Sequence, residues 1–353
     1  MRTIIAGVRS LRATSRTIVA VAVFAIALLL LALHGIAQPA SQSFAARIER
    51  LSEEGGDFDT DNLISNERSY LEVVPALKTT GVTGGVYIGV GPDQNFSYIA
   101  QIRPVIAFIV DIRRDNLLLH LLFKALFAAA PTRVEYLALL TGRPAPERPD
   151  AWRDASLERI VAHIDGGTPN AEAVRRLDQR LHDAIAGFGL PLSAADFDTI
   201  ARFHHTFTNA GLSLKFESRG RPPRDAYPSL RDLLLATDRA GRSWNYLTSE
   251  RDYQFVRSLE AQDLVVPVIG DLGGAHALAA IADLMRQRSE RLSAFYVSNV
   301  ETYLYGGKYS QFIKNIDRLP KDARSVIIRS IFRASVSTSE VRPASQFALA
   351  NRP

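Results

Sequence analysis

The stretch Val86-Tyr87-Ile88-Gly89-Val90-Gly91-Pro92 decides the fold class of this chain. Its first three residues form a short apolar run of strand-forming side chains, and the glycines after it predict a turn into a helix over about 95–103. A second run, residues 105–110, is continuously apolar and ends at Asp111. Such runs, without polar alternation, are typical of strands that helices cover on both faces of a parallel sheet. The region therefore predicts strand, helix and strand in order.

The same alternation returns later in the chain. A helix from Asp115 follows the second strand, and the C-terminal half adds strands at 264–269, 293–300 and 325–332 with helices at 249–260, 275–288 and 309–319. Five strands separated by helices predict an α/β fold with a doubly wound, mostly parallel, Rossmann-like sheet. This domain is expected at 79–335, with a helical insertion at about 131–227. Residues 38–78 are expected to be a linker with N-terminal helices, one at 63–78, and residues 336–353 a polar tail.

The N-terminus has the pattern of an export segment. Residues 18–33 are all apolar, four arginines precede them, and the small residues Gly35 and Ala37 follow. This predicts a secretory signal cleaved after Ala37, or an uncleaved membrane anchor with the body outside the cytoplasm. Two alternatives are a buried core helix and a start codon assigned too early, which would leave a cytoplasmic protein beginning near Ser41.

Composition excludes several classes of function. The chain is 47% hydrophobic and 22% charged, which is typical of a globular protein. The formal charge is +5, and the N-terminal arginines leave only +1 for the rest, so the sequence does not predict a nucleic-acid binder. The absence of cysteine excludes thiol nucleophiles, cysteine zinc sites and disulfides.

Polar residues and glycines stand where the predicted strands end. Gly89 and Gly91 follow the first strand and Asp111 ends the second, and the third and fourth are followed by Gly270-Asp271 and Ser298-Asn299. Ligands of open α/β sheets bind beyond the carboxyl ends of the strands, and an acidic residue about 20 positions after the glycines is suited to ribose hydroxyls. The alternatives are a plain turn for the glycines and a helix N-cap for Asp111. Because Asp115 is the better cap, Asp111 is expected to be free for a ligand.

These residues resemble the cofactor signature of class I S-adenosylmethionine-dependent methyltransferases. The resemblance implies a glycine loop, with Gly89 and Gly91, under the methionine part of S-adenosylmethionine, Asp111 at the ribose and Asp271 near the adenine. Asn299 or Glu301 would orient the nucleophile. The segments 64–67, 87–96 and 108–116 further resemble an uncharacterised, methyltransferase-like bacterial family.

The sequence departs from the methyltransferase pattern at four points. The loop has two glycines where three are usual, and no acidic residue precedes it directly. The connection between the second and third strands is long, and no final antiparallel hairpin is expected after Phe332. These departures leave the predicted α/β fold unchanged. They bear on the methyltransferase activity, which depends on the arrangement of the residues at the strand ends.

Other residues suggest weaker sites. Arg113 and Arg114 are candidates for binding a substrate carboxylate or phosphate, with solvated surface arginines as the alternative. His204 and His205 are adjacent, and neighbours on a helix point in different directions, so no metal site is predicted.

Two functions remain open from the sequence. The first is a methyltransferase acting on a small or medium acceptor under the helical insertion. The second is a non-catalytic, membrane-tethered or periplasmic protein that uses the same crevice for another small ligand. The export segment favours the second, and the polar strand ends favour the first.

Overall fold

The computed structural model describes residues 43–219, 227–305, 307–333 and 336–350, and the fold below is that of the unit beginning at Phe44. It is an α/β fold around one six-stranded sheet in the order β3-β2-β1-β4-β5-β6. The predicted α/β fold with a mostly parallel sheet is confirmed, and the strand order is compatible with a Rossmann-like fold. The strands are β1 (Val86–Gly89), β2 (Ile106–Asp111), β3 (Val265–Ile269), β4 (Leu292–Ser298), β5 (Val326–Arg333) and β6 (Val336–Pro343).

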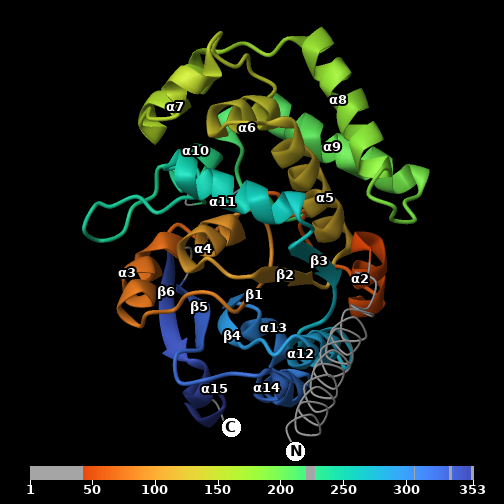
Figure 1. Cartoon of the computed structure of the whole chain (residues 1–353), viewed down its shortest axis with the longest axis vertical. Helices are drawn as coiled ribbons and strands as arrows, with labels where there is room; N and C mark the ends of the chain where they lie inside the picture. The colour runs from red at the N-terminus through yellow and green to blue at the C-terminus, as the bar shows by residue number, and fades with distance from the viewer. Residues whose placement is uncertain (1–42, 220–226, 306, 334–335, 351–353) are drawn as a thin grey trace, which may run out of the picture. The chain divides into compact units, whose positions relative to one another are not determined.

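Strand order reverses between β1 and β4, both of which pair with parallel neighbours. Ile88 aligns with Phe108 of β2 on one side and with Phe295 of β4 on the other. The helices α4 (Gln94–Ile102), α5 (Arg114–Ala129) and α11 (Glu250–Ala261) lie above the sheet in Figure 1, and α12 (Ala277–Gln287) and α14 (Tyr309–Arg318) lie below it. Apolar side chains of strands and helices form one buried core between these layers. The sheet is therefore doubly wound.

The C-terminal end of the chain corrects two expectations. Residues 336–343 are not a polar tail but the antiparallel strand β6, in which Ser339 pairs with Ser330 of β5. The antiparallel hairpin that the sequence did not predict is therefore present, and α15 (Ala344–Ala350) follows it. β6 is an edge strand, where polar side chains are usual, so it has no apolar alternation for a sequence pattern to detect.

The helix predicted at 63–78 is confirmed only for its second half. Only η1 (Tyr70–Val73) and α3 (Val74–Thr79) are helical there, and Pro75 lies in the first turn of α3, where proline favours a helix start. The hydroxyl oxygen of Ser65 accepts a hydrogen bond from the Glu67 N–H at 3.1 Å, a local bond that competes with helix formation. Residues 52–69, here called the strap, instead follow α2 (Phe44–Leu51) in irregular conformation.

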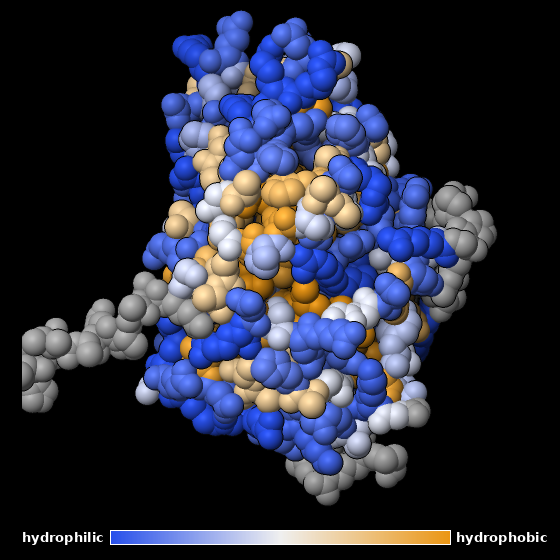
Figure 2. All heavy atoms as spheres, turned by 90° about the vertical axis from the view of Figure 1, so that its right-hand side faces the viewer, coloured by the Kyte–Doolittle hydropathy of each residue, from blue (hydrophilic) through white to orange (hydrophobic). Residues whose placement is uncertain are grey.

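A helical region interrupts the α/β pattern between β2 and β3, as the sequence predicted. It contains α6 (Arg133–Thr141), η2 (Pro149–Trp152), α7 (Leu157–Gly166), α8 (Ala171–Ala186), α9 (Ala194–Ala210) and η3 (Gly211–Ser213), and α10 (Leu230–Leu234) follows. Figure 1 shows α6 to α9 in the upper part of the view, away from the sheet, and α6, α8 and α9 contact α5. In the view of Figure 2, apolar side chains gather near the middle of the visible face and hydrophilic ones cover most of the rest.

No helix within the described ranges is long and apolar enough to cross a membrane. The segment 1–37, expected to be an export signal or anchor, lies outside the described residues.

Candidate functional site

A cavity of about 330 Å³ lies at the carboxyl ends of the strands, where the strand order reverses. Its wall includes Gly91 after β1, Asp111 at the end of β2, Asp271 after β3 and Asn299 after β4. Five of the predicted site residues, these four and Arg113, therefore line one cavity, although they are up to about 200 positions apart in the sequence. Open α/β sheets bind ligands at this position.

The strap forms a wall of the cavity that the sequence did not predict. Its backbone crosses the sheet edge, because the Glu53 N–H donates to the Ile269 carbonyl at 2.9 Å and the Gly56 N–H to the Ile112 carbonyl at 2.8 Å. Cavity-lining residues of the strap are Asp57, Phe58, Thr60, Asn62, Ser65, Asn66 and Glu67. An irregular segment has no periodicity, so only the resemblance of residues 64–67 gave any signal for it.

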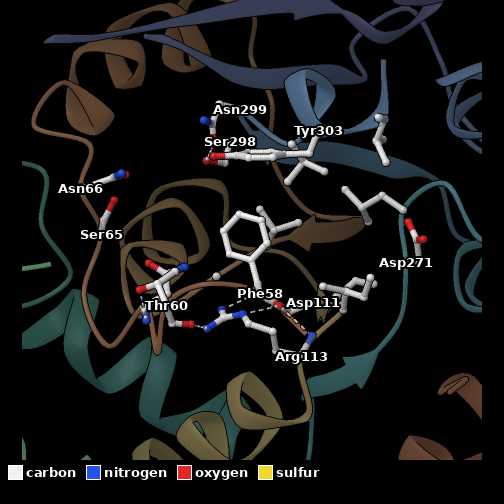
Figure 3. A pocket seen from close by; sticks show the side chains of 18 of the residues that line it. Phe58, Thr60, Ser65, Asn66, Asp111, Arg113, Asp271, Ser298, Asn299 and Tyr303 are labelled. Carbon is white, nitrogen blue, oxygen red and sulfur yellow. Dashed lines mark hydrogen bonds and ion pairs between the residues drawn. The ribbon is translucent and has the colours of Figure 1, made fainter. Parts of the chain in front are cut away.

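Arg113 holds the strap against the end of β2. Its Nε and Nη2 donate to the two carboxylate oxygens of Asp111 at 3.0 and 2.8 Å, and its Nη1 donates to the carbonyls of Thr60 and Asp61 at 3.0 and 2.7 Å. The dashed lines in Figure 3 show this arrangement below Phe58. The expectation that Asp111 is free is therefore wrong: Arg113 is its partner. Because Oδ1 also accepts the Arg113 backbone N–H, Oδ2 is the oxygen with spare capacity.

The two glycines after β1 have different roles. Gly91 has φ +80° and lines the cavity, and a Cβ there would lie 3.3 Å from the Asn62 and Gln94 side-chain nitrogens. Gly89 is not among the lining residues, and a Cβ on it would meet Asn95 Oδ1 at 1.9 Å. Gly89 therefore makes room for Asn95, and only Gly91 is placed for a ligand.

The glycine loop is supported from behind. Asn95 donates to the carbonyls of Val90 and Pro92 at 2.9 and 2.7 Å. His120 of α5 contacts the Gly91 carbonyl through Nε2 at 2.9 Å. Burial lowers the pKa of His120 to about 4, so the ring is neutral near pH 7 and donates this hydrogen through Nε2. These bonds fix the loop before any ligand arrives.

The remaining predicted residues lie in different places. Asn299 lines the cavity, and Asp271 lines it while pairing with Lys308 at 2.5 Å. Glu301 does not line it: its buried carboxylate lies 2.9 Å from Arg329 of β5. Arg114 lines a separate hollow of about 260 Å³ and makes two hydrogen bonds to Asp196 of α9. Glu301 and Arg114 are therefore not part of the cavity.

Two aromatic side chains mark the opening of the cavity. Phe58 of the strap and Tyr303 of α13 (Glu301–Leu304) are 36% and 59% exposed, and their rings meet edge to face at 5.0 Å. Figure 3 shows Phe58 in the middle of the view with Tyr303 above it. Exposed aromatic rings beside a cavity provide a surface for a flat or apolar ligand group.

The polar end of the cavity contains a buried carboxyl group. Glu67 is 1% exposed, and its two oxygens accept hydrogen bonds from the hydroxyls of Ser298 and Ser330. Burial raises the pKa of Glu67. Ser298 has φ +52°, a strained conformation for a residue with a side chain, and strain of this kind is frequent at functional sites.

Two histidines of the insertion share one carboxylate partner. His204 and His205 both contact the carboxylate of Asp178, at 2.5 and 3.1 Å. Within the described ranges there is no group of three or more His, Cys, Asp or Glu side chains placed to hold a metal ion.

Comparison with known proteins gives a family. No curated protein sequence matches the chain. One family model matches two stretches that together make up more than half of it and contain Glu67, Gly91, Asp111 and Asn299. Because residues 63–150 and 224–349 match this model, the chain belongs to the family described as Domain of unknown function (DUF7790).

Proposed function

We propose that the cavity binds S-adenosylmethionine and that the protein is a methyltransferase-like enzyme acting on a small or medium acceptor. The observation that carries this proposal is the convergence of Gly91, Asp111, Asp271 and Asn299 on one cavity at the reversal of strand order. The sheet order, with an antiparallel strand at the β5 edge, is compatible with the resemblance that the sequence suggested.

The side chains of the cavity suit a nucleoside. Ile112 and Leu272 follow the acidic strand ends and line the same cavity, so each of Asp111 and Asp271 has an apolar neighbour for a base. The spare capacity of Asp111 Oδ2 suits one ribose hydroxyl. Gly91 has no side chain, so the space between its backbone and the side chains of Asn62 and Gln94 stays open. These residues would hold the nucleoside part of the molecule.

The charge of the cavity suits a cationic methyl donor. Four carboxyl groups (Asp57, Glu67, Asp111 and Asp271) and two cations (Arg113 and Lys308) line it. An excess of acidic groups attracts a positively charged ligand. S-adenosylmethionine would supply a methyl group activated by a positively charged sulfur. The protein would orient the acceptor, with Asn299 at the open end of β4, and would hold both molecules together.

A second function has support from the sequence. The arginine-flanked apolar run at 18–33 favours export or membrane attachment of the body outside the cytoplasm. The cavity would then serve a non-catalytic, membrane-tethered or periplasmic protein that binds another small ligand. A reporter fused after residue 60 distinguishes the two: activity outside the inner membrane favours export, and activity in the cytoplasm favours the enzyme.

Calorimetry on the full chain tests the enzyme proposal. S-adenosylmethionine and S-adenosylhomocysteine are each expected to bind with a dissociation constant below about 1 mM, corresponding to about 4 kcal/mol. If neither binds at millimolar concentration, the methyltransferase proposal is wrong and the ligand-binding function is the remaining candidate.

A further inference from the structure

The Glu67 carboxyl group is buried in the cavity wall without a cation. Ser298 and Ser330 each donate a hydroxyl hydrogen to it, and the Tyr296 hydroxyl is a third hydrogen-bond partner. Within the described part of the chain, no lysine, arginine or histidine forms an ion pair with Glu67, although most carboxyl groups of the site have such a partner. A buried carboxylate without a cation is costly, because hydroxyl groups replace only part of its hydration.

A second buried acceptor lines the same cavity and is connected to Glu67. Gln94 is 6% exposed, and its Oε1 has no hydrogen-bond partner among the described residues. Its amide nitrogen donates to the Tyr296 hydroxyl at 3.3 Å, and that hydroxyl contacts Glu67. Buried acceptors are almost always satisfied, so an unpartnered one in a cavity wall indicates a donor on the ligand.

A primary ammonium group fits these two acceptors better than other common donors do. It carries three N–H donors and a positive charge, whereas a hydroxyl group has one donor and no charge. Charge-assisted hydrogen bonds to a carboxylate are stronger than neutral ones. The surplus of carboxyl groups in the cavity favours the same charge.

We propose that the Glu67 end of the cavity binds a primary amine as the methyl acceptor, and that Glu67 takes a proton from its ammonium group. The proposal rests on the proposed function for the methyl donor. One N–H bond of the ammonium breaks, its electron pair stays on nitrogen, and an O–H bond forms on the Glu67 carboxylate. The neutral amine has the lone pair that an electrophilic methyl carbon requires.

The surroundings of Glu67 support its role as proton acceptor. Burial raises the pKa of Glu67, which makes the carboxylate a better base than an exposed one. The phenols that face it, Tyr87, Tyr98 and Tyr296, have pKa values raised well above 10 by burial, so they stay neutral. Glu67 is thus the carboxyl group at this end of the cavity that is placed to accept the proton.

Two matched probes test the proposal: 2-phenylethylamine and 2-phenylethanol, which differ only in their polar group. Each is titrated into the full chain, with and without S-adenosylhomocysteine. The amine is expected to bind wild type at least about 10-fold more tightly than the alcohol, and Glu67→Gln to remove this preference. The control is Glu72→Gln, since Glu72 pairs with Arg239 at 2.9 Å and does not line the cavity. This control is expected to keep the preference.

A pH series on wild type gives an answer that does not depend on the variant folding. As the pH is lowered from 8, protonation of Glu67 is expected to weaken amine binding more than alcohol binding, and the alcohol controls for the titration of Asp93 beside Gln94. An amine that binds no better than its alcohol, or equally well to Glu67→Gln, overturns the amine proposal even when S-adenosylhomocysteine binds. If S-adenosylhomocysteine does not bind but the amine preference depends on Glu67, the amine site stands and the methyl-donor proposal fails.

Discussion

Arg113 and Asp111, two residues apart at the end of β2, form a buried pair in which both carboxylate oxygens accept from the same guanidinium, at 3.0 and 2.8 Å. Their side chains are 7% and 12% exposed. The same guanidinium binds the carbonyls of Thr60 and Asp61. One side chain therefore joins the strap to the sheet and orients the carboxylate that the proposal assigns to the ligand.

Arg113→Met is expected to lower the free energy of unfolding by about 3 kcal/mol, because it leaves Asp111 without its partner and two strap carbonyls without a donor. The control is Arg114→Met, which removes an ion pair to Asp196 from a side chain that is 46% exposed. That change is expected to cost about 1 kcal/mol or less. Urea denaturation measures both, and equal losses would contradict the special role of Arg113.

Gly91→Ala is expected to weaken S-adenosylhomocysteine binding. The alanine strains a backbone with φ +80°, and its Cβ lies 3.3 Å from the Asn62 and Gln94 side chains. Gly81→Ala is a matched control, since Gly81 has φ +67° and nothing within 4 Å of the added carbon. Both variants are expected to lose about 1–2 kcal/mol of stability from backbone strain, and only the first to lose affinity. Unchanged binding in Gly91→Ala would place the ligand elsewhere.

Asp93→Asn is expected to stabilise the protein above neutral pH. Burial raises the pKa of Asp93 to about 7 from 3.8, so the folded state keeps its proton where the unfolded state has lost it. The stability that this proton contributes is complete below about pH 4 and is lost as pH rises toward 7, up to about 4 kcal/mol. Thermal unfolding from pH 4 to 8 should show a smaller decline in Asp93→Asn. The exposed Asp283→Asn is the control, and an equal decline in all three proteins would contradict the prediction.

The sequence predicted the parallel part of the sheet because its strands are short, continuous apolar runs. The runs 105–110 and 264–269 are followed directly by Asp111 and Gly270, and β2 and β3 lie within one residue of the predicted boundaries. The position of Asp111, Asp271 and Asn299 in one cavity followed from this order, because parallel strands end at the same edge.

Long-range contacts account for what the sequence did not predict. The strap has no periodic pattern, and its conformation depends on bonds such as Glu53 to Ile269 and Arg113 to Thr60. The expectation for Glu301 failed because its carboxylate in α13 pairs with Arg329 of β5, a contact between two elements that are separate in sequence. Partners that are distant in sequence give no local signal.

The sequence predicted that the insertion is helical. It did not predict that the insertion contacts the edge of the site. The family model leaves out residues 151–223, which include α7, α8 and α9. Yet Asp196 of α9 binds Arg114, directly after the residue that holds the strap. The insertion therefore contacts the edge of the site from outside the matched region.

Calorimetry with S-adenosylhomocysteine on wild type, Asp111→Ala and Arg114→Met tests most directly whether Asp111 holds the ligand. Arg114 does not line the cavity, so its loss leaves the proposed ribose acceptor and its Arg113 partner in place. Wild type is expected to bind, Asp111→Ala to bind about 10- to 150-fold more weakly through loss of one charged hydrogen bond of about 1.5–3 kcal/mol, and Arg114→Met to stay within about 3-fold of wild type. Equal affinity in wild type and Asp111→Ala, or no binding by wild type at millimolar concentration, would mean that Asp111 does not hold this ligand.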